Sequence, residues 1–416
     1  MFDDFADFIT KCPTPFHFAA YARQKFLDAG FTELKETEVY SEIPKKGFSI
    51  RNERLVLAWK DGGHDCSCIA CSHCDSPCFI LKPNFDEVVG GYRRARSSTY
   101  GGGLWYTWLD RDLRLAGRVI HRTHEGLKST LYDSKVGIAT IPCLAIHLDY
   151  SFCYSPKDLS PEDNLIPIYG KESDPPLKEF IASQLSIKSE DIVTLDLRFI
   201  DAEQPNQVND ILTSQRLDNM QNTYIIFKSF LDSEPQDGHL NMLGVFDNEE
   251  TGSSTRCGAM SSAIDDTLQR ILNDTDIRAF KAKSLVLSFD SNHATNPNFP
   301  NINEVNHKIY LGKGISLERD PNYDCSCDMK NEYAIREAAR SLGLNVQTNT
   351  VLNSGSGGST IGPMTETRSG ILTCDAGAPV LGMHSIRENG TVADIESGYK
   401  IVCELYNHYK KYQFPL

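Results

Sequence analysis

The chain has 416 residues, more than one simple core fills, so we expect two domains or one large domain with an insertion. Hydrophobic residues make up 40% and charged residues 24%, which excludes a disordered or fibrous chain. The net charge of -14 opposes binding to nucleic acid or to an anionic membrane, because both are polyanions.

The amino-terminal part predicts helices followed by strands. Residues 2–30 carry apolar side chains at helical spacing and end at Gly30, a residue that often stops helices. The stretches RLVLAWK (54–60) and CSCIACSH (66–73) are predicted as strands. The start, MFDDFADFIT, lacks the pattern of a secretory signal, and no apolar run is long enough to cross a bilayer, so we expect a cytoplasmic protein.

The pattern changes between residues 84 and 197, where short apolar runs are broken by turns. Candidate strands there are YGGGLWYTW, LAGRVIHRTH and VGIATIPCLAIHL. This pattern predicts a β-rich domain inserted into a discontinuous domain of residues 1–83 and 198–416. In the second part, strand-like runs (HLNMLGVFD, SLVLSFDS, APVLGMHS) alternate with helical patterns such as NEYAIREAARSLG, which predicts an α/β fold with a largely parallel sheet.

The cysteines allow two interpretations. There are 13 of them, an odd number, so we expect reduced thiols and no disulfide framework. Four of them, Cys68, Cys71, Cys74 and Cys78, have the spacing of an iron–sulfur ligand run. In a strand, alternate side chains point to opposite faces, so the four sulfurs would not converge on one cluster. An iron–sulfur protein is therefore the less favoured of these two interpretations, and it stays as an alternative.

Metal-capable side chains recur where predicted strands end or a helical stretch begins. These residues are His73, Asp218, Glu249, Glu250, Asp290 and His384. The carboxyl ends of the strands in an open α/β sheet border the ligand crevice, so we expect the side chains to converge there. Imidazoles and carboxylates suit zinc, with cobalt or manganese as alternatives, and a carboxylate without a metal could act as general base.

Each of these residues also has a structural alternative when taken alone. A histidine at a strand end is usually structural, and the acidic stretch FDNEETGS could be a solvated loop. Asp218 could cap a helix, and Asp290 could cap a turn. The pattern assigns no role to Asp247, the first acid of the stretch.

Seven segments in order resemble motifs of one known family. They are SHCDSPC, YGGGLWYTWLDRDLRLAGRV, LAIHLD, RLDN, FDNEETGS, STIGP and MHSIRE. They resemble the aspartyl aminopeptidase and aminopeptidase I family of di-zinc metallopeptidases. The resemblance implies a three-layer α/β/α peptidase domain with an inserted β-rich dimerisation domain, and dimers assembled into a tetrahedral dodecamer. It also implies removal of single N-terminal residues from short unblocked peptides.

The resemblance further implies a set of metal ligands. Asp218 corresponds to a carboxylate that bridges two zinc ions. His73 and Asp290 correspond to the other protein ligands of one zinc, and Glu250 and His384 to those of the second.

Three more residues receive roles from the resemblance. Glu249 corresponds to the general base, which takes the proton of a metal-activated water and passes it to the leaving amine. Asp75 corresponds to a carboxylate that orients the imidazole of His73. His147 in LAIHLD corresponds to a histidine that reaches the active site of a neighbouring subunit, and its alternative is a strand histidine of the inserted domain.

The sequence also departs from the family pattern. Acid-selective relatives carry a lysine downstream of the KG turn, where an ungapped placement puts Asn322, so preference for N-terminal Asp or Glu is open. The stretch GSGGSTIGP replaces the SPCGTTIGP common in relatives, and Asn296 replaces a histidine. A non-catalytic, self-assembling family member is the remaining alternative.

Overall fold

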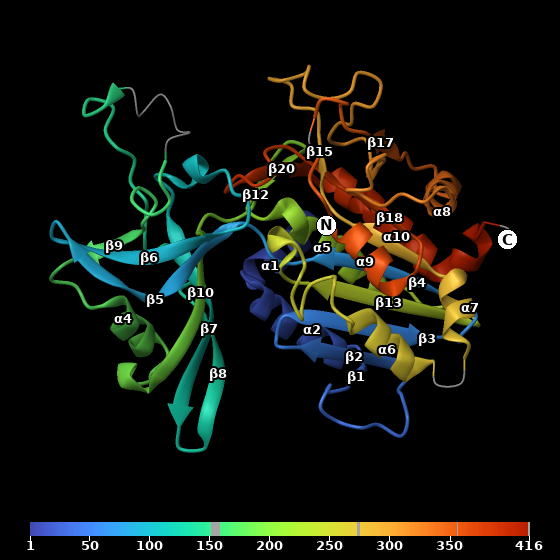
Figure 1. The fold of residues 1–416 in the computed structure, drawn as a ribbon, viewed down its shortest axis with the longest axis horizontal. Helices are drawn as coiled ribbons and strands as arrows, with labels where there is room; N and C mark the ends of the chain where they lie inside the picture. Colours follow the sequence, from blue (N-terminus) through green and yellow to red (C-terminus); the bar gives the residue numbers. More distant parts are fainter. Residues whose placement is uncertain (151–158, 273–274, 356, 415–416) are drawn as a thin grey trace.

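The computed structural model describes residues 1–150, 159–272, 275–355 and 357–414. A nine-stranded mixed sheet lies between two layers of helices, and a six-stranded antiparallel sheet lies beside it (Figure 1). Two small sheets complete the fold: β11 (Asn206–Val208), β12 (Ile211–Ser214) and β20 (Glu388–Thr391), and β15 (Asn292–His293) with β19 (Pro379–Val380). Within the described residues, every helix is too short or too polar to span a bilayer.

The large sheet is mixed, with parallel pairs in its centre and at its two outer ends. Its order is β1 (Thr32–Glu33), β2 (Lys46–Arg51), β3 (Leu55–Asp61), β13 (His239–Phe246), β4 (Cys66–His73), β14 (Leu285–Phe289), β18 (Thr373–Gly377), β16 (Ser316–Glu318) and β17 (Gln347–Asn349). β13, β4, β14 and β18 run parallel, whereas β3 and β16 pair antiparallel with the strands at the two sides of this group. The prediction of a largely parallel sheet is therefore wrong for three pairs among the described strands, β2–β3, β3–β13 and β16–β18, which are antiparallel.

Helices cover both faces of the sheet because the central strands carry apolar side chains on both faces. Cys68 and Ala70 of β4 pack in a core with α1 (Phe2–Lys11), α2 (Pro15–Asp28), α5 (Leu217–Asp232), α8 (Met329–Ser341) and α10 (Val392–Tyr412). Ile69 and Cys71 pack on the other face with α6 (Ala263–Ile271), α7 (Ile277–Ala282) and α9 (Ile361–Ser369). All eight positions of β4 are buried, as expected for a strand between two helical layers.

The second sheet has the order β8 (Gly126–Asp133), β7 (Leu113–Thr123), β10 (Ile192–Asp201), β5 (Cys78–Val89), β6 (Tyr92–Tyr100) and β9 (Ile168–Lys171). All its pairs are antiparallel. One helix, α4 (Leu177–Gln184), contributes Leu177 and Ile181 to its core. The strands span residues 78–201, slightly more on each side than the 84–197 expected for an inserted domain.

Three predicted strands are wrong. In YGGGLWYTW only Tyr100 belongs to a strand, and Trp105–Trp108 form a 3-10 turn because both tryptophans pack on Phe79. VGIATIPCLAIHL forms isolated bridges at Ala139 and Thr140 and no strand. In APVLGMHS, only the two residues of β19 form a strand, which pairs with β15 outside the large sheet, and Leu381 adds an isolated bridge to Asn389.

The structure excludes the iron–sulfur alternative. Cys68 and Cys74 pack in the core on one face of the large sheet, whereas Cys71 packs on the opposite face. Cys78 belongs to the core of the second sheet. Four sulfurs in three separate cores cannot ligate one cluster.

Candidate metal centre

Three parallel strands bring their carboxyl ends to one edge of the large sheet. β4 ends at His73, which is level with Phe246 at the end of the neighbouring β13. Asp290 follows β14 directly, on the other side of β4. The turn after β13 carries Glu249 and Glu250. This edge of an α/β sheet is the usual position of a ligand site.

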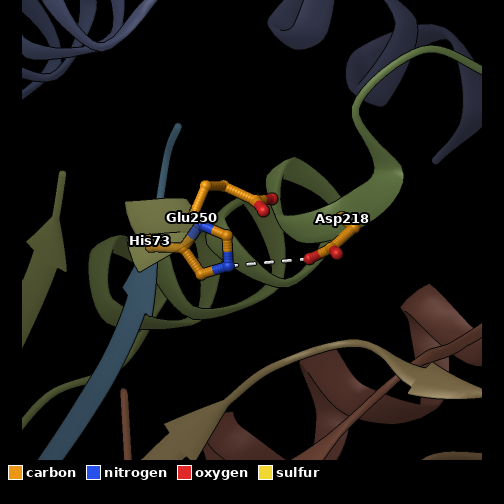
Figure 2. A group of neighbouring side chains, drawn as sticks. All are labelled: His73, Asp218 and Glu250. Atoms are coloured by element: carbon orange, nitrogen blue, oxygen red, sulfur yellow. Dashed lines mark ion pairs between the residues drawn. The ribbon is translucent and has the colours of Figure 1, made fainter. Parts of the chain in front are cut away.

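Asp218 lies at the centre of this edge, in the first turn of α5. Its Oδ1 is 3.5 Å from Nε2 of His73, and its Oδ2 is 3.3 Å from Nε2 of His384. Nε2 of His73 is also 3.5 Å from Oδ1 of Asp290, and Nε2 of His384 is 3.3 Å from Oε2 of Glu250. Figure 2 shows the carboxylate of Asp218 facing the imidazole of His73, with the carboxylate of Glu250 beside them. One carboxylate therefore faces two imidazoles, each of which faces another acid.

The donor atoms of this centre fit a metal ion. The ligand atoms of His73, Asp218 and Glu250 all lie within 4.8 Å of one another. Asp218 Oδ1 and Glu250 Oε1 are buried and have no hydrogen-bond partner among the described residues. Buried acceptors without a donor are costly, and a cation would satisfy them. Imidazole nitrogen and carboxylate oxygen are zinc ligands.

Crowding shifts the pKa values of the metal-free groups. Burial lowers the pKa of His384, but Asp218 and Glu250 raise it to about 10. Burial raises the pKa of Glu249 to about 8, although His73 acts in the opposite direction. Burial also acts to raise the pKa of Asp218, but the two histidines hold it below its ordinary value. Without a metal, protons take the place of the cations that these acids require.

Asp75 holds both the histidine and the acidic turn. Nδ1 of His73 is 3.1 Å from the backbone carbonyl oxygen of Asp75 and 3.3 Å from its Oδ1. The Asp75 carboxylate accepts hydrogen bonds from the backbone N–H groups of Glu249 (3.2 Å) and Glu250 (3.1 Å). It also accepts one from the hydroxyl of Tyr100 at 2.6 Å. Asp75 therefore positions three of the predicted site residues at once.

Three supporting residues were missed by the sequence reasoning: Tyr100, Gly102 and Glu388. Glu388 accepts the backbone N–H groups of Asp218 and His384, both at 2.9 Å. The carbonyl oxygen of Gly102 lies 2.9 Å from Nδ1 of His384. All three residues lie inside the motifs YGGGLWYTWLDRDLRLAGRV and MHSIRE, but a motif does not show which of its polar groups contact the site.

Asp247 is not part of the acid cluster. It is fully buried, and its Oδ2 lies 3.1 Å from an Nη of Arg54. Its Oδ1 accepts the backbone N–H of Asn248, whose left-handed conformation (φ 65°) turns the chain before Glu249. A left-handed non-glycine residue is uncommon and costs free energy, so the Asp247 contacts stabilise a strained turn.

His147 lies outside the site of its own chain. It belongs to residues 142–150, all of which are exposed, and its ring contacts Tyr150. No described residue of this segment lines the cavity at the metal centre. Its predicted role in a neighbouring subunit stays a prediction.

A cavity of about 200 Å³ opens beside the metal centre. Its lining includes His73, Asp218, Glu249, Asp290 and His384, and beyond them Glu318, Asp320, Cys325, Val351 and residues 357–360. Residue 356 of the GSGGSTIGP stretch lies outside the described residues. A larger cavity of about 520 Å³ borders Cys66 and Ser284 at the opposite ends of the strands, away from the ligands.

Comparisons with known proteins agree on one family. The family model described as aminopeptidase I zinc metalloprotease (M18) matches residues 8–406. An aspartyl aminopeptidase of Caenorhabditis elegans is 32% identical over 439 residues, covering 95% of this chain and 92% of that protein. These matches confirm the resemblance that the motifs predicted.

Solved structures show the same fold. A chain in the cryo-EM structure of the Ape4 and Nbr1 complex is 28% identical, with a TM-score of 0.95 over 99% of this chain and 87% of that one. The mApe1 dodecamer of S. cerevisiae is 26% identical, with a TM-score of 0.87 over 99% of this chain and 97% of that one. The mixed sheet with a separate antiparallel sheet is therefore the M18 arrangement.

Tyr100→Phe tests whether the hydrogen bond from the second sheet to Asp75 contributes to metal binding. The change removes the hydroxyl that donates to Asp75, so we expect about 10–100-fold weaker metal binding or activity. Metal affinity is measured by competition with a chromogenic chelator. Tyr106→Phe, at a half-exposed position, is the matched control. Equal affinities for both variants and the unaltered protein would contradict the role of Tyr100.

Metal removal should make stability depend on pH. The folded, metal-free chain raises the pKa of Glu249 from 4.5 to about 8 and that of His384 from 6.5 to about 10. It therefore binds these protons more tightly than the unfolded chain, and its stability falls as pH rises from about 4.5 to about 10. Melting temperatures of chelator-treated protein at about pH 6 and about pH 9 measure this loss, and added zinc should remove most of the difference. An identical pH dependence with and without zinc would contradict the shared cation site.

Proposed function

The chain belongs to the M18 family of zinc metalloproteases and is a metalloaminopeptidase, and we propose that it removes single N-terminal residues from short unblocked peptides at a two-zinc centre. The observation that carries this proposal is the position of Asp218. Its two oxygens face two separate imidazoles, which is the arrangement expected of a carboxylate shared by two cations. A single cation would leave one of the two histidine–acid pairs without a metal.

The remaining ligands divide into two pairs. His73 and Asp290 would complete one site, and Glu250 and His384 the other, because each pair lies within 3.5 Å. Zinc is the family metal, with cobalt or manganese as chemical alternatives. Bound zinc would lower the pKa of a water molecule and polarise the scissile carbonyl.

Glu249 is the residue we assign to proton transfer. It lines the cavity, its side chain is partly exposed, and its Oε2 lies 3.8 Å from Nε2 of His73. Its carboxylate accepts the proton of the attacking water and delivers it to the leaving amine. The backbone N–H of Glu249 is held by Asp75, so the carboxylate approaches the reacting atoms from a fixed turn.

The complete set of ligands and base argues against the non-catalytic alternative. A non-catalytic, self-assembling family member that bound no metal would be destabilised by buried acids crowded around two histidines. The buried cysteines that the structure describes are all free thiols, which supports action in the reducing cytoplasm.

We further propose that the chain assembles from dimers into a tetrahedral dodecamer, which is supported by its similarity to mApe1, a dodecamer. The exposed segment 142–150 carries large apolar side chains, including Leu148 at 74% and Tyr150 at 58% exposure. Exposed apolar patches favour docking on another subunit. His147 precedes Leu148 and its ring contacts Tyr150, and we assign it to the site of the neighbouring subunit.

Glu249→Gln tests the mechanism. The amide keeps the shape of the side chain but cannot accept a proton, so we expect peptidase kcat to fall by about 100–10,000-fold. Metal content, measured by atomic emission, should stay at two zinc ions per chain, whereas Glu250→Gln should lose one. Glu179→Gln, exposed on α4, is the matched control. Retained activity in Glu249→Gln would overturn the assigned role.

Mixed assemblies test His147. We expect His147→Ala to lower kcat/KM, because each site would lack a group from its neighbour. Assembled together with Glu249→Gln chains, the His147→Ala chains should regain activity, since their intact centres receive His147 from the inactive partner. His124→Ala, with the histidine side chain 89% exposed, is the control. Absence of recovery in mixed assemblies would place His147 outside the site.

A further inference from the structure

The cavity beside the metal centre also carries groups that the reaction does not use. We propose that this cavity selects peptides with a basic N-terminal residue, lysine or arginine, and that Glu318 and Asp320 recognise the cationic side chain. The proposal rests on the aminopeptidase function above. A basic residue is a substrate class unlike the acidic one that the name of the similar aspartyl aminopeptidase of Caenorhabditis elegans specifies.

Both acids come from β16 and the segment directly after it, and both reach the cavity beside the metal centre. Glu318 is the last residue of β16, which pairs with β18, and Asp320 lies in the turn that follows. Both line the same cavity as His73 and Asp290. Asn322, the position that the sequence placed opposite an acidic substrate, is exposed and does not line the cavity.

Glu318 is a buried acid without a cationic partner. It is 6% exposed, and both of its oxygens accept hydrogen bonds from the side-chain amide of Asn349, at 2.9 and 2.8 Å. Among the described residues, neither Glu318 nor Asp320 forms an ion pair, and the adjacent Arg319 pairs with Glu332 instead. Burial and the charge of Asp320 raise the pKa of Glu318 to about 7, although Asn349 lowers it. A cation in the cavity would supply the missing partner.

The rest of the lining favours a cation as well. The charged or ionisable side chains among the described lining residues are carboxylates, histidines and one cysteine, with neither lysine nor arginine. An N-terminal Asp or Glu would place its carboxylate beside two others, which is repulsive. A lysine or arginine side chain would instead gain charge-assisted hydrogen bonds.

The two acids are held in place before a substrate arrives. Asn349 of β17 fixes the Glu318 carboxylate, and Asn349 is itself 4% exposed. Asp320 accepts the backbone N–H groups of Asn322 (2.9 Å) and Asp324 (3.0 Å). A rigid pair of carboxylates loses little entropy on binding, so it discriminates well between side chains.

Position separates these acids from the site of the substrate's α-amino group. The α-nitrogen lies about 2.5 Å from the scissile carbonyl carbon, so it must stay close to the metal ligands and Glu249. A lysine ammonium lies several bonds farther along the side chain. Glu318 and Asp320 belong to β16 and its following turn and to no ligand-bearing segment, which suits recognition of the side chain.

The first experiment compares chromogenic amides of lysine, arginine, norleucine, leucine, aspartate and glutamate with zinc-loaded protein. We expect kcat/KM for lysine and arginine to exceed that for norleucine by at least about tenfold, with aspartate and glutamate lowest. Glu318→Gln and Asp320→Asn should move the lysine-to-norleucine ratio toward one. Asp320→Lys should raise the ratio of aspartate to lysine. Asp210→Asn, exposed in a distant turn, is the control.

A binding measurement separates this proposal from the aminopeptidase function. Calorimetry on Glu249→Gln protein should show lysinamide binding at least about tenfold more tightly than norleucinamide. If the unaltered protein cleaved none of the amides, the proposed aminopeptidase function would be refuted. The calorimetric comparison of lysinamide with norleucinamide would still test whether the cavity prefers a basic side chain. Preference for aspartate or glutamate, equal binding of the two amides, or an equal loss for all amides in Glu318→Gln would overturn it. An equal loss for all amides would indicate that Glu318 and Asp320 bind the α-amino group of the substrate instead of its side chain.

Discussion

The interaction on which the site depends is the repulsion between carboxylates at the carboxyl edge of the large sheet. Four carboxylates and two imidazoles are placed within a few ångströms, with Asp218 between His73 and His384. Burial raises the cost of keeping like charges together, so the arrangement needs cations or bound protons. Bound cations would also coordinate the buried oxygens of Asp218 and Glu250 that have no hydrogen-bond partner among the described residues. The same repulsion therefore bears on both the stability and the chemistry of the site.

The second sheet takes part in this centre through short connections. Tyr100 ends β6 and donates to Asp75, and the following Gly102 offers its carbonyl to His384. In the proposed function, the ligands come from β4, from α5 and from the segments that follow β13, β14 and β19, while residues at the end of the antiparallel sheet's β6 and just after it contact Asp75 and His384. Because outer contacts of this kind set ligand orientation and basicity, the position of one sheet relative to the other bears on catalysis.

The acids on the two sides of the cavity differ in their partners. On one side, acids are matched by histidines and, in the proposed function, by zinc. On the other, Glu318 is held only by the neutral amide of Asn349 and is raised in pKa by burial and Asp320. An acid that has no cationic partner among the described residues is available to a substrate cation. Metal binding and substrate choice would thus use the same type of residue in two electrostatic settings.

The sequence by itself determined the family, the helices and central strands, and the six candidate residues at strand and helix ends, because apolar periodicity and ordered motifs are local properties. It failed for the stretches around Trp105 and Ala139 and for the edge strands, since their form depends on contacts with distant segments. Only the tertiary structure separated buried Asp247 from the acid cluster and placed Asp320, rather than Asn322, in the cavity. Distance and burial decide which acids interact, and neither can be read from order along the chain.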